Sequence, residues 1–437
     1  MRTLYPIRHI LFLLLLCCST GLTKAQLQCE NDTSYLRSLI DLKTGLYLGY
    51  QGGLYPDGLN TMPYPHYADG MNISRQIVPL NADGALDLAD GKVGFICLGA
   101  STAGNAFNHF KTVCEADTTV NPCIKFANCA VGAKGLEVMI DTVEDAWYWD
   151  DEVMPDLDYA GITRYQVQVA WVMVTSRIDT ILIWPYQPQE VANKYEALMQ
   201  VLLVKFPNLK QVYLSGFNYG GYADPTKEFY DMIMEPSSYW NNWSVKFLIE
   251  RQLDGDPSLK YKAPDRVAPW LGWGPHLWAD GLRDNVTDHL RWVCEADYKP
   301  DGGGYHMSNS GKDKMGKLIY DFFINSPIAA DWFKYGARWV SCDPDFRTEA
   351  PQTEPTIRIS PNPAGSNAML VLDHWADLPV EVDVYNGIGQ PVQHINFCPS
   401  NSYMAYPVSL DGLPAGTYHI VARQTGLQVM ALTFLKQ

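Results

Sequence analysis

The chain has 437 residues, and its 33 Lys and Arg against 48 Asp and Glu give a formal net charge of −15. Hydrophobic residues make up 47% and charged residues 19%, a balance that excludes a disordered chain. The acidic balance argues against a general nucleic-acid binder, and the length predicts two or three domains. No internal stretch reaches the roughly 20 apolar residues that a membrane span needs.

The first 25 residues have the pattern of a secretory signal peptide. Arg2 and Arg8 precede the apolar run Ile10–Cys18, and a small-residue site at 23–25 precedes Gln26. An uncleaved anchor is the alternative, but the apolar run is short. We therefore expect a secreted or cell-surface protein that passes through the periplasm.

Export changes the interpretation of the cysteines, of which eight follow the signal peptide. None of them forms a C-x-x-C pair, so we expect no zinc or other metal site. In an oxidising compartment some cysteines should be bridged. Cys114 and Cys123 flank a short loop and are the expected disulfide pair, whereas Cys97 lies in an apolar strand and is expected to remain a buried thiol.

Residues 26–340 have the pattern of one α/β domain. Residues 26–90 are rich in Gly, Pro, Asn and Tyr and predict loops that cover a surface. After them, strands alternate with helices, which predicts a three-layer α/β/α domain around a parallel sheet, of the flavodoxin-like type. The expected strands are Val93–Leu98, Ile124–Ala130, Tyr165–Met173 and Leu209–Ser215, and the expected helices are Val191–Phe206, Ser237–Leu253 and Asp313–Phe323.

A polar, proline-bearing linker at 341–356 separates this domain from a C-terminal domain at 357–437. Short alternating strands divided by Asn-Gly, Asp-Gly and Ala-Gly turns predict a small antiparallel β-sandwich there. The expected strands are Ile357–Ile359, Met369–Leu372, Val380–Tyr385, Val392–Phe397, Tyr418–Arg423 and Val429–Leu435.

Ser101 stands where a nucleophile is exposed in many α/β enzymes. The strand 93–98 runs into the small-residue turn Gly99–Gly104, which opens a helix. Helix-end N–H groups at such a turn can stabilise an oxyanion. The alternative is that Ser101 is only a helix N-cap.

A serine nucleophile needs a base, and His306 is the candidate. It lies in the segment Asp301–Gly311, immediately before the last helix of the domain. Asp301 can fix the tautomer of the ring, which then takes the hydroxyl proton of Ser101. The alternative is a solvent-exposed loop in which Asp301 serves only as a capping residue, the glycines form turns and the histidine is solvated.

Together these residues resemble the SGNH/GDSL-type hydrolases, and more specifically a secreted bacterial subgroup of them. The resemblance spans roughly residues 45–325. It rests on Gly52–Gly58, Leu98–Ser101, Gln166–Trp171, Tyr213–Ser215, Tyr219–Ala223, Trp273–Gly281 and the segment from Asp301 to Gly311.

The resemblance implies ester hydrolysis with neither a metal nor a cofactor. Ser101 would attack the carbonyl, His306 would act as base and Asp301 would orient His306. The oxyanion donors would be the amide of Ser101 and that of Gly132. We expect the substrate to be an acylated carbohydrate or another small ester, and the carbohydrate part rests on the aromatic segments and the expected cell-surface location rather than on the resemblance.

Two departures keep a second function open. Asp301 and His306 are five residues apart, whereas the family usually has three, and the Gly-x-Asn-Asp block that supplies an oxyanion Asn is not visible after Trp171. A non-catalytic surface protein that binds carbohydrate on the same fold is therefore the alternative. The aromatic segments at 147–149, 239–243 and 270–278 permit sugar stacking but more often pack in a core.

The C-terminal domain resembles the sorting domain of the type IX secretion system of Bacteroidota. The matching segments are Ile359–Pro363, Val384–Gln390 and Leu413–Tyr418. The resemblance implies the type IX secretion machinery as a partner. A generic ligand-binding β-sandwich is the alternative.

Overall fold

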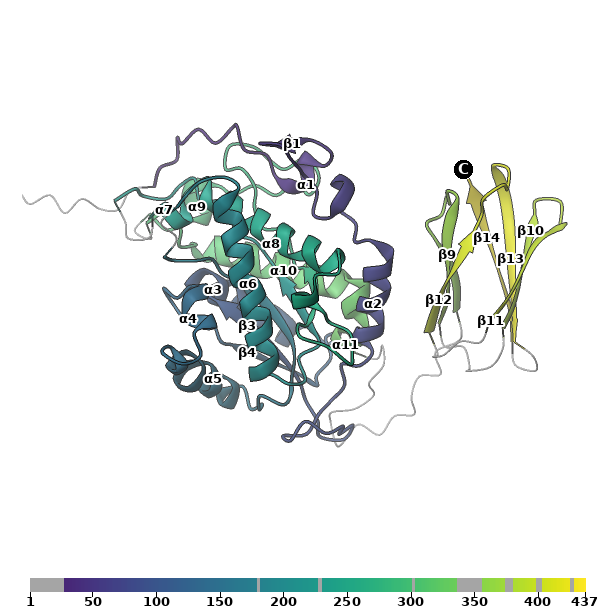
Figure 1. The fold of residues 1–437 in the computed structure, drawn as a ribbon, viewed down its shortest axis with the longest axis horizontal. Coiled ribbons are helices and arrows are strands. Elements are labelled where there is room, and N and C mark those ends of the chain that lie inside the picture. Colours follow the sequence, from purple (N-terminus) through teal and green to yellow (C-terminus); the bar gives the residue numbers. More distant parts are fainter. Residues whose placement is uncertain are drawn as a thin grey trace, which may run out of the picture. The chain divides into compact units, whose positions relative to one another are not determined.

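The computed structural model describes residues 27–178, 181–226, 230–300, 303–335, 356–373, 380–397, 403–424 and 428–437. The expected signal peptide, nearly all of the expected linker, and Asp301 lie outside these residues. The chain divides into two compact units, Met1–Asp345 and Phe346–Gln437 (Figure 1).

The first unit is built around a five-stranded parallel sheet. Its strand order is β4-β3-β5-β6-β7, and every neighbouring pair is parallel. The strands are β3 (Val93–Gly99), β4 (Ile124–Asn128), β5 (Val167–Met173), β6 (Gln211–Leu214) and β7 (Trp270–Trp273). Every residue of β3 and β5 is buried, as expected for strands that are covered on both faces.

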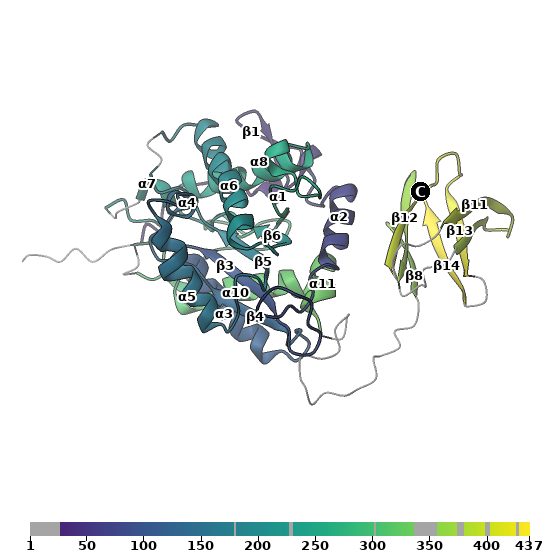
Figure 2. The same cartoon turned by 60° about the horizontal axis from the view of Figure 1, so that its bottom comes forward.

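Helices cover both faces of this sheet (Figures 1 and 2). Because crossovers between parallel strands are right-handed, α3, which leads out to β4, lies on one face, and α6 and α8, which lead to β6 and β7, lie on the other. Accordingly α3 packs against α10, and α6 packs against α8. The helices are α3 (Ser101–Ala116), α4 (Leu136–Ile140), α5 (Met154–Tyr159), α6 (Tyr186–Lys205), α7 (Tyr230–Ile233), α8 (Ser237–Leu253), α9 (Cys294–Asp297), α10 (Asn309–Asn325) and α11 (Pro327–Phe333).

An aromatic cluster centred on Phe95 of β3 fills the space between the sheet and α3, α10 and α11. The ring of Phe95 lies 5.6 Å from Phe107, 4.9 Å from Phe323 and 5.7 Å from Trp332, measured between centroids. These residues come from the three helices of one face, so the cluster fixes the helices against the strand that leads to Ser101.

Residues 26–90 are not only loops, which corrects the sequence expectation. They contain α1 (Leu39–Leu42), the short pair β1 (Leu46–Tyr47) and β2 (Tyr50–Gln51), and the eleven-residue helix α2 (Tyr64–Ser74). Gly70 has a low helix propensity, yet a Cβ there would lie 2.6 Å from the Trp270 ring. The His66 ring also stacks on Trp270 at 5.0 Å, so tertiary packing stabilises a helix that local propensity disfavours.

The second unit consists of two antiparallel sheets with a shared core. One has the order β11-β10-β13-β14 and the other β12-β9-β8. The strands are β8 (Thr356–Ser360), β9 (Asn367–Asp373), β10 (Val380–Asn386), β11 (Pro391–Phe397), β12 (Tyr403–Ser409), β13 (Gly416–Gln424) and β14 (Gln428–Lys436). The sequence analysis missed β12, which contains Pro407. It lies at the edge of its sheet, where a proline is tolerated.

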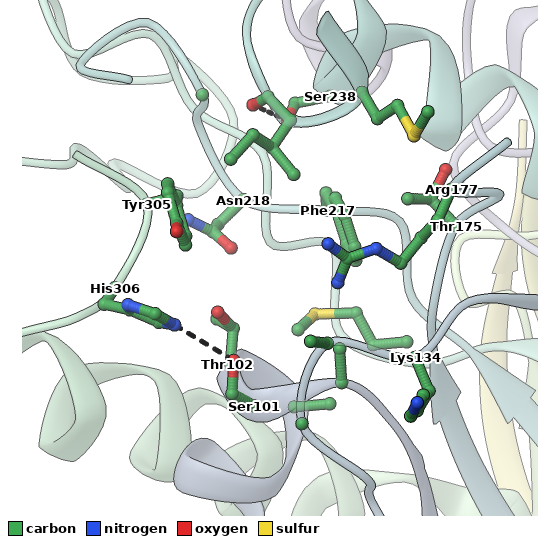
Figure 3. Close-up of a pocket in the computed structure, with 18 of the residues that line it drawn as sticks. Ser101, Thr102, Lys134, Thr175, Arg177, Phe217, Asn218, Ser238, Tyr305 and His306 are labelled. Carbon is green, nitrogen blue, oxygen red and sulfur yellow. Dashed lines mark hydrogen bonds between the residues drawn. The ribbon is translucent and has the colours of Figure 1, made fainter. Parts of the chain in front are cut away.

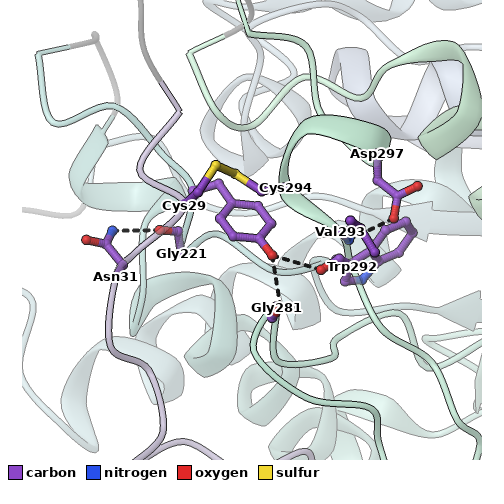
Figure 4. Close-up of a disulfide and its surroundings, with 9 residues drawn as sticks. Cys29, Asn31, Gly221, Gly281, Trp292, Val293, Cys294 and Asp297 are labelled. Atoms are coloured by element: carbon purple, nitrogen blue, oxygen red, sulfur yellow. Dashed lines mark hydrogen bonds between the residues drawn. A yellow bond between two sulfur atoms is a disulfide. The ribbon is translucent and has the colours of Figure 1, made fainter.

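The expected disulfide between Cys114 and Cys123 is wrong, because Cys114 is a free, buried thiol. It lies on the face of α3 that packs into the core. Cys97 is a buried free thiol, as expected. The structure instead joins Cys29 to Cys294, which ties the beginning of the described chain to α9 (Figure 4).

The aromatic segments considered for sugar stacking supply mainly core residues. Trp149, Trp243, Trp270 and Trp278 are fully or almost fully buried. None of the helices within the described ranges has both the length and the apolar composition of a membrane-spanning segment.

Candidate active site

Ser101 lies at the carboxyl edge of the central sheet. β3 ends at Gly99 and α3 begins at Ser101, so only Ala100 separates the strand from the helix. Gly99 permits this close packing, because a Cβ there would lie 2.3 Å from the carbonyl oxygen of Met173. The strand order reverses at β3, and ligands of open α/β sheets bind in the crevice at such a point.

His306 reaches Ser101 from the segment between α9 and α10. Its Nε2 lies 3.1 Å from the Oγ of Ser101, although the two residues are 205 positions apart (Figure 3). The carbonyl of His306 accepts the N–H of Lys299 at 3.0 Å. Two of the site residues expected from the sequence therefore meet in space.

The two glycines that lengthen the spacing between Asp301 and His306 form a tight turn. Gly303 and Gly304 have φ angles of +69° and +74°, a region that glycine occupies without strain. The carbonyl of Gly303 accepts the N–H of Asp224 at 2.9 Å, and a Cβ on Gly304 would lie 1.8 Å from the carbonyl oxygen of Tyr222. The additional residues therefore pack against the segment after β6.

The surroundings of His306 favour its neutral form. Burial lowers the pKa of His306, and the nearby positive charges of Lys299 and Lys312 lower it further. A neutral ring can accept the hydroxyl proton of Ser101 at Nε2, provided that its own proton is on Nδ1. The described residues supply no hydrogen-bond partner for Nδ1 of His306, and Asp301 lies outside them.

The first turn of α3 provides backbone donors beside Ser101. The first hydrogen bond of the helix runs from the N–H of Gly104 to the carbonyl of Ala100 at 3.0 Å, and no side chain caps the helix. The N–H groups of residues 101–103 therefore have no acceptor within the helix, and they carry the partial positive charge of its end. Such donors suit an oxyanion.

Gly132, the other expected oxyanion donor, lines the same cavity from the loop after β4. Nothing lies within 4 Å of the position that a Cβ would take there, so packing does not require glycine.

The segment after β5 places Thr175 and Arg177 at the cavity. The carbonyl of Thr175 accepts the N–H of Leu136 at 3.0 Å, and the carboxylate of Glu137 accepts the N–H of Arg177 at 3.1 Å. The start of α4 therefore fixes this segment in place.

Asn218 also lines the cavity, although the sequence analysis left it out. Its Nδ2 lies 2.9 Å from the hydroxyl of Tyr298, which itself donates to the carbonyl of Tyr219 at 2.6 Å. Because the Tyr298 hydroxyl has only one proton, its oxygen must accept from Asn218, which directs Oδ1 of Asn218 into the cavity (Figure 3). The position of Asn218 after β6, at the edge that carries Ser101, is the signal that could have identified it.

The cavity has a volume of about 460 Å³ and a mixed lining. Met173, Phe217, Met232 and Ile233 give it apolar walls, and hydroxyl, amide and basic groups interrupt them. A lining of this kind fits a small organic molecule with several polar groups.

Comparisons with known proteins give no family. No family model matches the chain, and no curated protein matches it. Among solved structures, an acetyl xylan esterase is 13% identical, with 52% of this chain and 98% of that chain covered and a TM-score of 0.24. A gut microbial diltiazem-metabolizing enzyme is 11% identical, with 72% of each chain covered and a TM-score of 0.29. At these scores the similarities do not establish a common fold.

Proposed function

We propose that this protein is a serine esterase of SGNH type that removes an acyl group from a carbohydrate. The 3.1 Å contact between Oγ of Ser101 and Nε2 of His306 is the observation that carries the proposal. The contact lies in a cavity at the carboxyl edge of a parallel sheet, beside an uncapped helix end. A nucleophile, a base and donors for the developing charge are the parts that acyl transfer requires.

In the first half of the reaction, Ser101 attacks the ester carbonyl carbon while Nε2 of His306 takes the hydroxyl proton. The negative charge that develops on the carbonyl oxygen is met by the amides of Ser101 and Gly132 and by the positive end of α3. His306 then gives its proton to the departing alkoxide of the sugar, which leaves the acyl group on Ser101.

In the second half, His306 takes a proton from water, whose oxygen attacks the acyl carbon. His306 returns that proton to Oγ of Ser101, and the carboxylic acid is released. Neither half of the reaction involves oxidation or reduction. Asp301 completes the proposed arrangement by accepting a hydrogen bond from Nδ1–H of His306, which orients the ring and stabilises the imidazolium that forms in each half.

The carbohydrate part of the proposal rests on the lining of the cavity. Oδ1 of Asn218 offers an acceptor to a hydroxyl group, and Tyr305 offers both a ring face and a hydroxyl. Aromatic faces next to hydrogen-bonding groups suit sugar rings.

A carbohydrate-binding protein without catalysis is the second candidate. It is favoured by the lack of a partner for Nδ1 of His306 among the described residues and by the missing Gly-x-Asn-Asp block after Trp171. A site that lacks one oxyanion donor loses about 10²–10³ in rate.

Labelling with a fluorophosphonate probe separates the two candidates. We expect the mature protein to be labelled at Ser101 and the labelling to be lost in Ser101→Ala and His306→Ala. Ser238→Ala is the matched control, because Ser238 lines the same cavity but its hydroxyl is bound to the carbonyl of Ile233 at 2.6 Å. An unlabelled wild-type protein that still binds acetylated sugars would favour the non-catalytic candidate.

We also propose that the protein is exported, with residues 1–25 removed and residues 357–437 acting as a type IX sorting domain. The disulfide between Cys29 and Cys294 supports an oxidising compartment, since such bonds are rare in reducing ones. Mass spectrometry of the cell-surface protein tests this: the proposal expects a chain that begins at Gln26.

A further inference from the structure

Asn218 presents a fixed hydrogen-bond acceptor to the cavity. Its side chain is almost fully buried, and Nδ2 lies 2.9 Å from the Tyr298 hydroxyl and 3.4 Å from the carbonyl oxygen of Tyr219. A carbonyl oxygen can only accept, and the Tyr298 hydroxyl donates its single proton to that same carbonyl at 2.6 Å. Both contacts therefore require the amide nitrogen at this end of Asn218. Among the described residues none of its side-chain hydrogen bonds uses Oδ1, which is directed into the cavity (Figure 3).

An acceptor in this position can have only a limited set of roles. Oδ1 of Asn218 cannot stabilise an oxyanion, because two oxygens with partial negative charge repel each other, so this residue does not replace a missing oxyanion donor. It can bind a group that carries a proton, such as a hydroxyl. An ether or ester oxygen in the same place would leave both oxygens without a hydrogen bond, and a site built in this way discriminates against such an analogue.

Tyr298 connects this acceptor to the segment that carries the base. Tyr298 forms an isolated antiparallel bridge with Met307, and the N–H of Lys299 donates to the carbonyl of His306 at 3.0 Å. The Tyr298 side chain is fully buried. Asn218 and His306 are thus held by the same pair of strands. Because His306 gives its proton to the departing alkoxide, the group that meets Asn218 belongs to the sugar and not to the acyl chain.

We propose that Asn218 selects esters whose sugar ring carries a free hydroxyl near the acylated position, and that Tyr298 is a positioning residue for Asn218. This inference rests on the proposed esterase function and narrows its substrate class to partially acylated sugars. A ring whose other hydroxyls are all acylated offers only acceptor oxygens to Oδ1 and should react slowly. Such a ring becomes a good substrate once another deacylation has exposed a hydroxyl.

The test compares monoacetates of cyclohexanediols with their methyl ethers, in which the free hydroxyl becomes a methoxy group. One pair has this group one ring carbon from the ester, and the other pair has it two ring carbons away. We expect the full-length mature protein to have a kcat/KM about 5- to 10-fold higher for the hydroxyl compound of at least one pair, as for one neutral hydrogen bond. Asn218→Leu, which nearly keeps the size of the side chain, should abolish this preference. A preference due only to the bulk of the methoxy group would survive that substitution.

Tyr298→Phe tests the positioning role. Without the hydroxyl, only the 3.4 Å contact to Tyr219 holds Nδ2, so the amide of Asn218 can turn and donate to a methoxy oxygen. The preference for the hydroxyl compound should shrink because the methyl ether reacts relatively faster. A merely structural loss would lower both rates alike.

Tyr222→Phe is the matched control, since it removes a buried tyrosine hydroxyl from the same group of rings. The rings of Tyr222 and Tyr298 are 5.0 Å apart, but the Tyr222 hydroxyl donates to the carbonyl of Trp292 at 2.8 Å and has no contact with Asn218. The preference for the hydroxyl compound should survive this substitution.

Two results would overturn the proposal. One is equal rates within both pairs for the wild-type protein, and the other is an unchanged preference in a folded Asn218→Leu protein. If Asn218→Leu does not fold, Tyr298→Phe decides, and an unchanged preference in that variant counts against the proposal.

Binding separates this inference from the esterase function. In Ser101→Ala, which cannot form the acyl intermediate, an NMR titration should show tighter binding of the hydroxyl compound than of its methyl ether. Loss of this difference in Ser101→Ala/Asn218→Leu supports the role of Asn218 even if the wild-type protein hydrolyses nothing. Hydrolysis without any preference for the hydroxyl would instead retain the esterase and reject that role.

Discussion

His306 shows how single residues set the chemistry of this site. Its ring is half-buried, and Lys299 and Lys312 add positive charge nearby. Both effects oppose protonation of the ring. A base must be neutral before it can accept a proton, so the environment of His306 favours the form that catalysis needs.

We expect the rate of fluorophosphonate labelling to rise with pH as His306 loses its proton. Because the pKa of His306 is lowered, the midpoint of this rise should lie below about 6.5, the ordinary value for histidine. Lys299→Gln and Lys312→Gln each remove a positive charge and should move the midpoint toward higher pH. Labelling rates measured between pH 4 and pH 8 check this.

Lys317→Gln serves as the control for this series. Lys317 is exposed on α10 and pairs with Asp321 on its own helix at 2.7 Å. Its removal should leave the midpoint unchanged. A wild-type midpoint above 6.5 would contradict the account given for His306.

At the scale of elements, Glu235 connects the cavity to α8. Its buried carboxylate accepts the N–H of Gly220 at 2.8 Å, that of Tyr239 at 2.9 Å and the indole N–H of Trp278 at 2.8 Å. Gly220 lines the cavity, Tyr239 is in the first turn of α8, and Trp278 follows β7. Burial nevertheless raises the pKa of Glu235 to about 7, because these three bonds only partly replace water.

Glu235→Gln should destabilise the first unit by about 1–3 kcal/mol at pH 5, because the amide nitrogen, unlike either oxygen of the protonated acid, cannot accept a hydrogen bond. At pH 8 the loss should be much smaller. With the folded pKa raised to about 7, the wild-type free energy of unfolding falls as pH rises from about 4.5 to about 7, whereas the glutamine variant lacks this slope. Urea unfolding at the two pH values measures both losses.

Glu144→Gln is the matched control, since Glu144 is exposed and none of the hydrogen bonds or ion pairs among the described residues involves its side chain. Its free energy of unfolding should equal that of the wild type at both pH values. A loss for Glu235→Gln that is as large at pH 8 as at pH 5 would show that Glu235 stays ionised throughout.

At the scale of the whole molecule, long-range links fasten the beginning of the described chain to the site-bearing unit. The disulfide joins Cys29 to Cys294 across 265 positions, and Nδ2 of Asn31 donates to the carbonyl of Gly221 at 2.6 Å beside it (Figure 4). Thr33 lies within hydrogen-bond distance of Tyr219 and Asp280. The N-terminal segment therefore braces the loop after β6, part of which lines the cavity.

Replacing Cys29 and Cys294 by serine should lower the free energy of unfolding of the first unit by about 2–4 kcal/mol, because the unfolded chain gains freedom. The effect appears as an earlier midpoint in urea unfolding followed by tryptophan fluorescence. Each single variant should lose as much as the double variant, since either one breaks the same bond. Losses that add would mean that the two cysteines act separately.

Much of the fold follows from local sequence patterns. The apolar runs that end at Gly99 and Met173 predicted buried strands, and α8 spans the residues that its pattern indicated, Ser237–Leu253. The short strand β7 was missed, because its two tryptophans indicate burial but do not distinguish a strand from other packed segments. α2 was missed as well, since it depends on Trp270, which is distant in sequence.

The sequence by itself determined the turn that exposes Ser101, because a strand, a small-residue turn and a helix are local patterns. It also indicated His306 as the candidate base. Only the tertiary structure decided that the two lie 3.1 Å apart and that Cys29, not Cys114, is bridged. The same holds for Asn218 and Arg177, which reach the cavity from different strands. Such contacts depend on how loops pack at the edge of the sheet, and the packing is set by residues far apart in the chain.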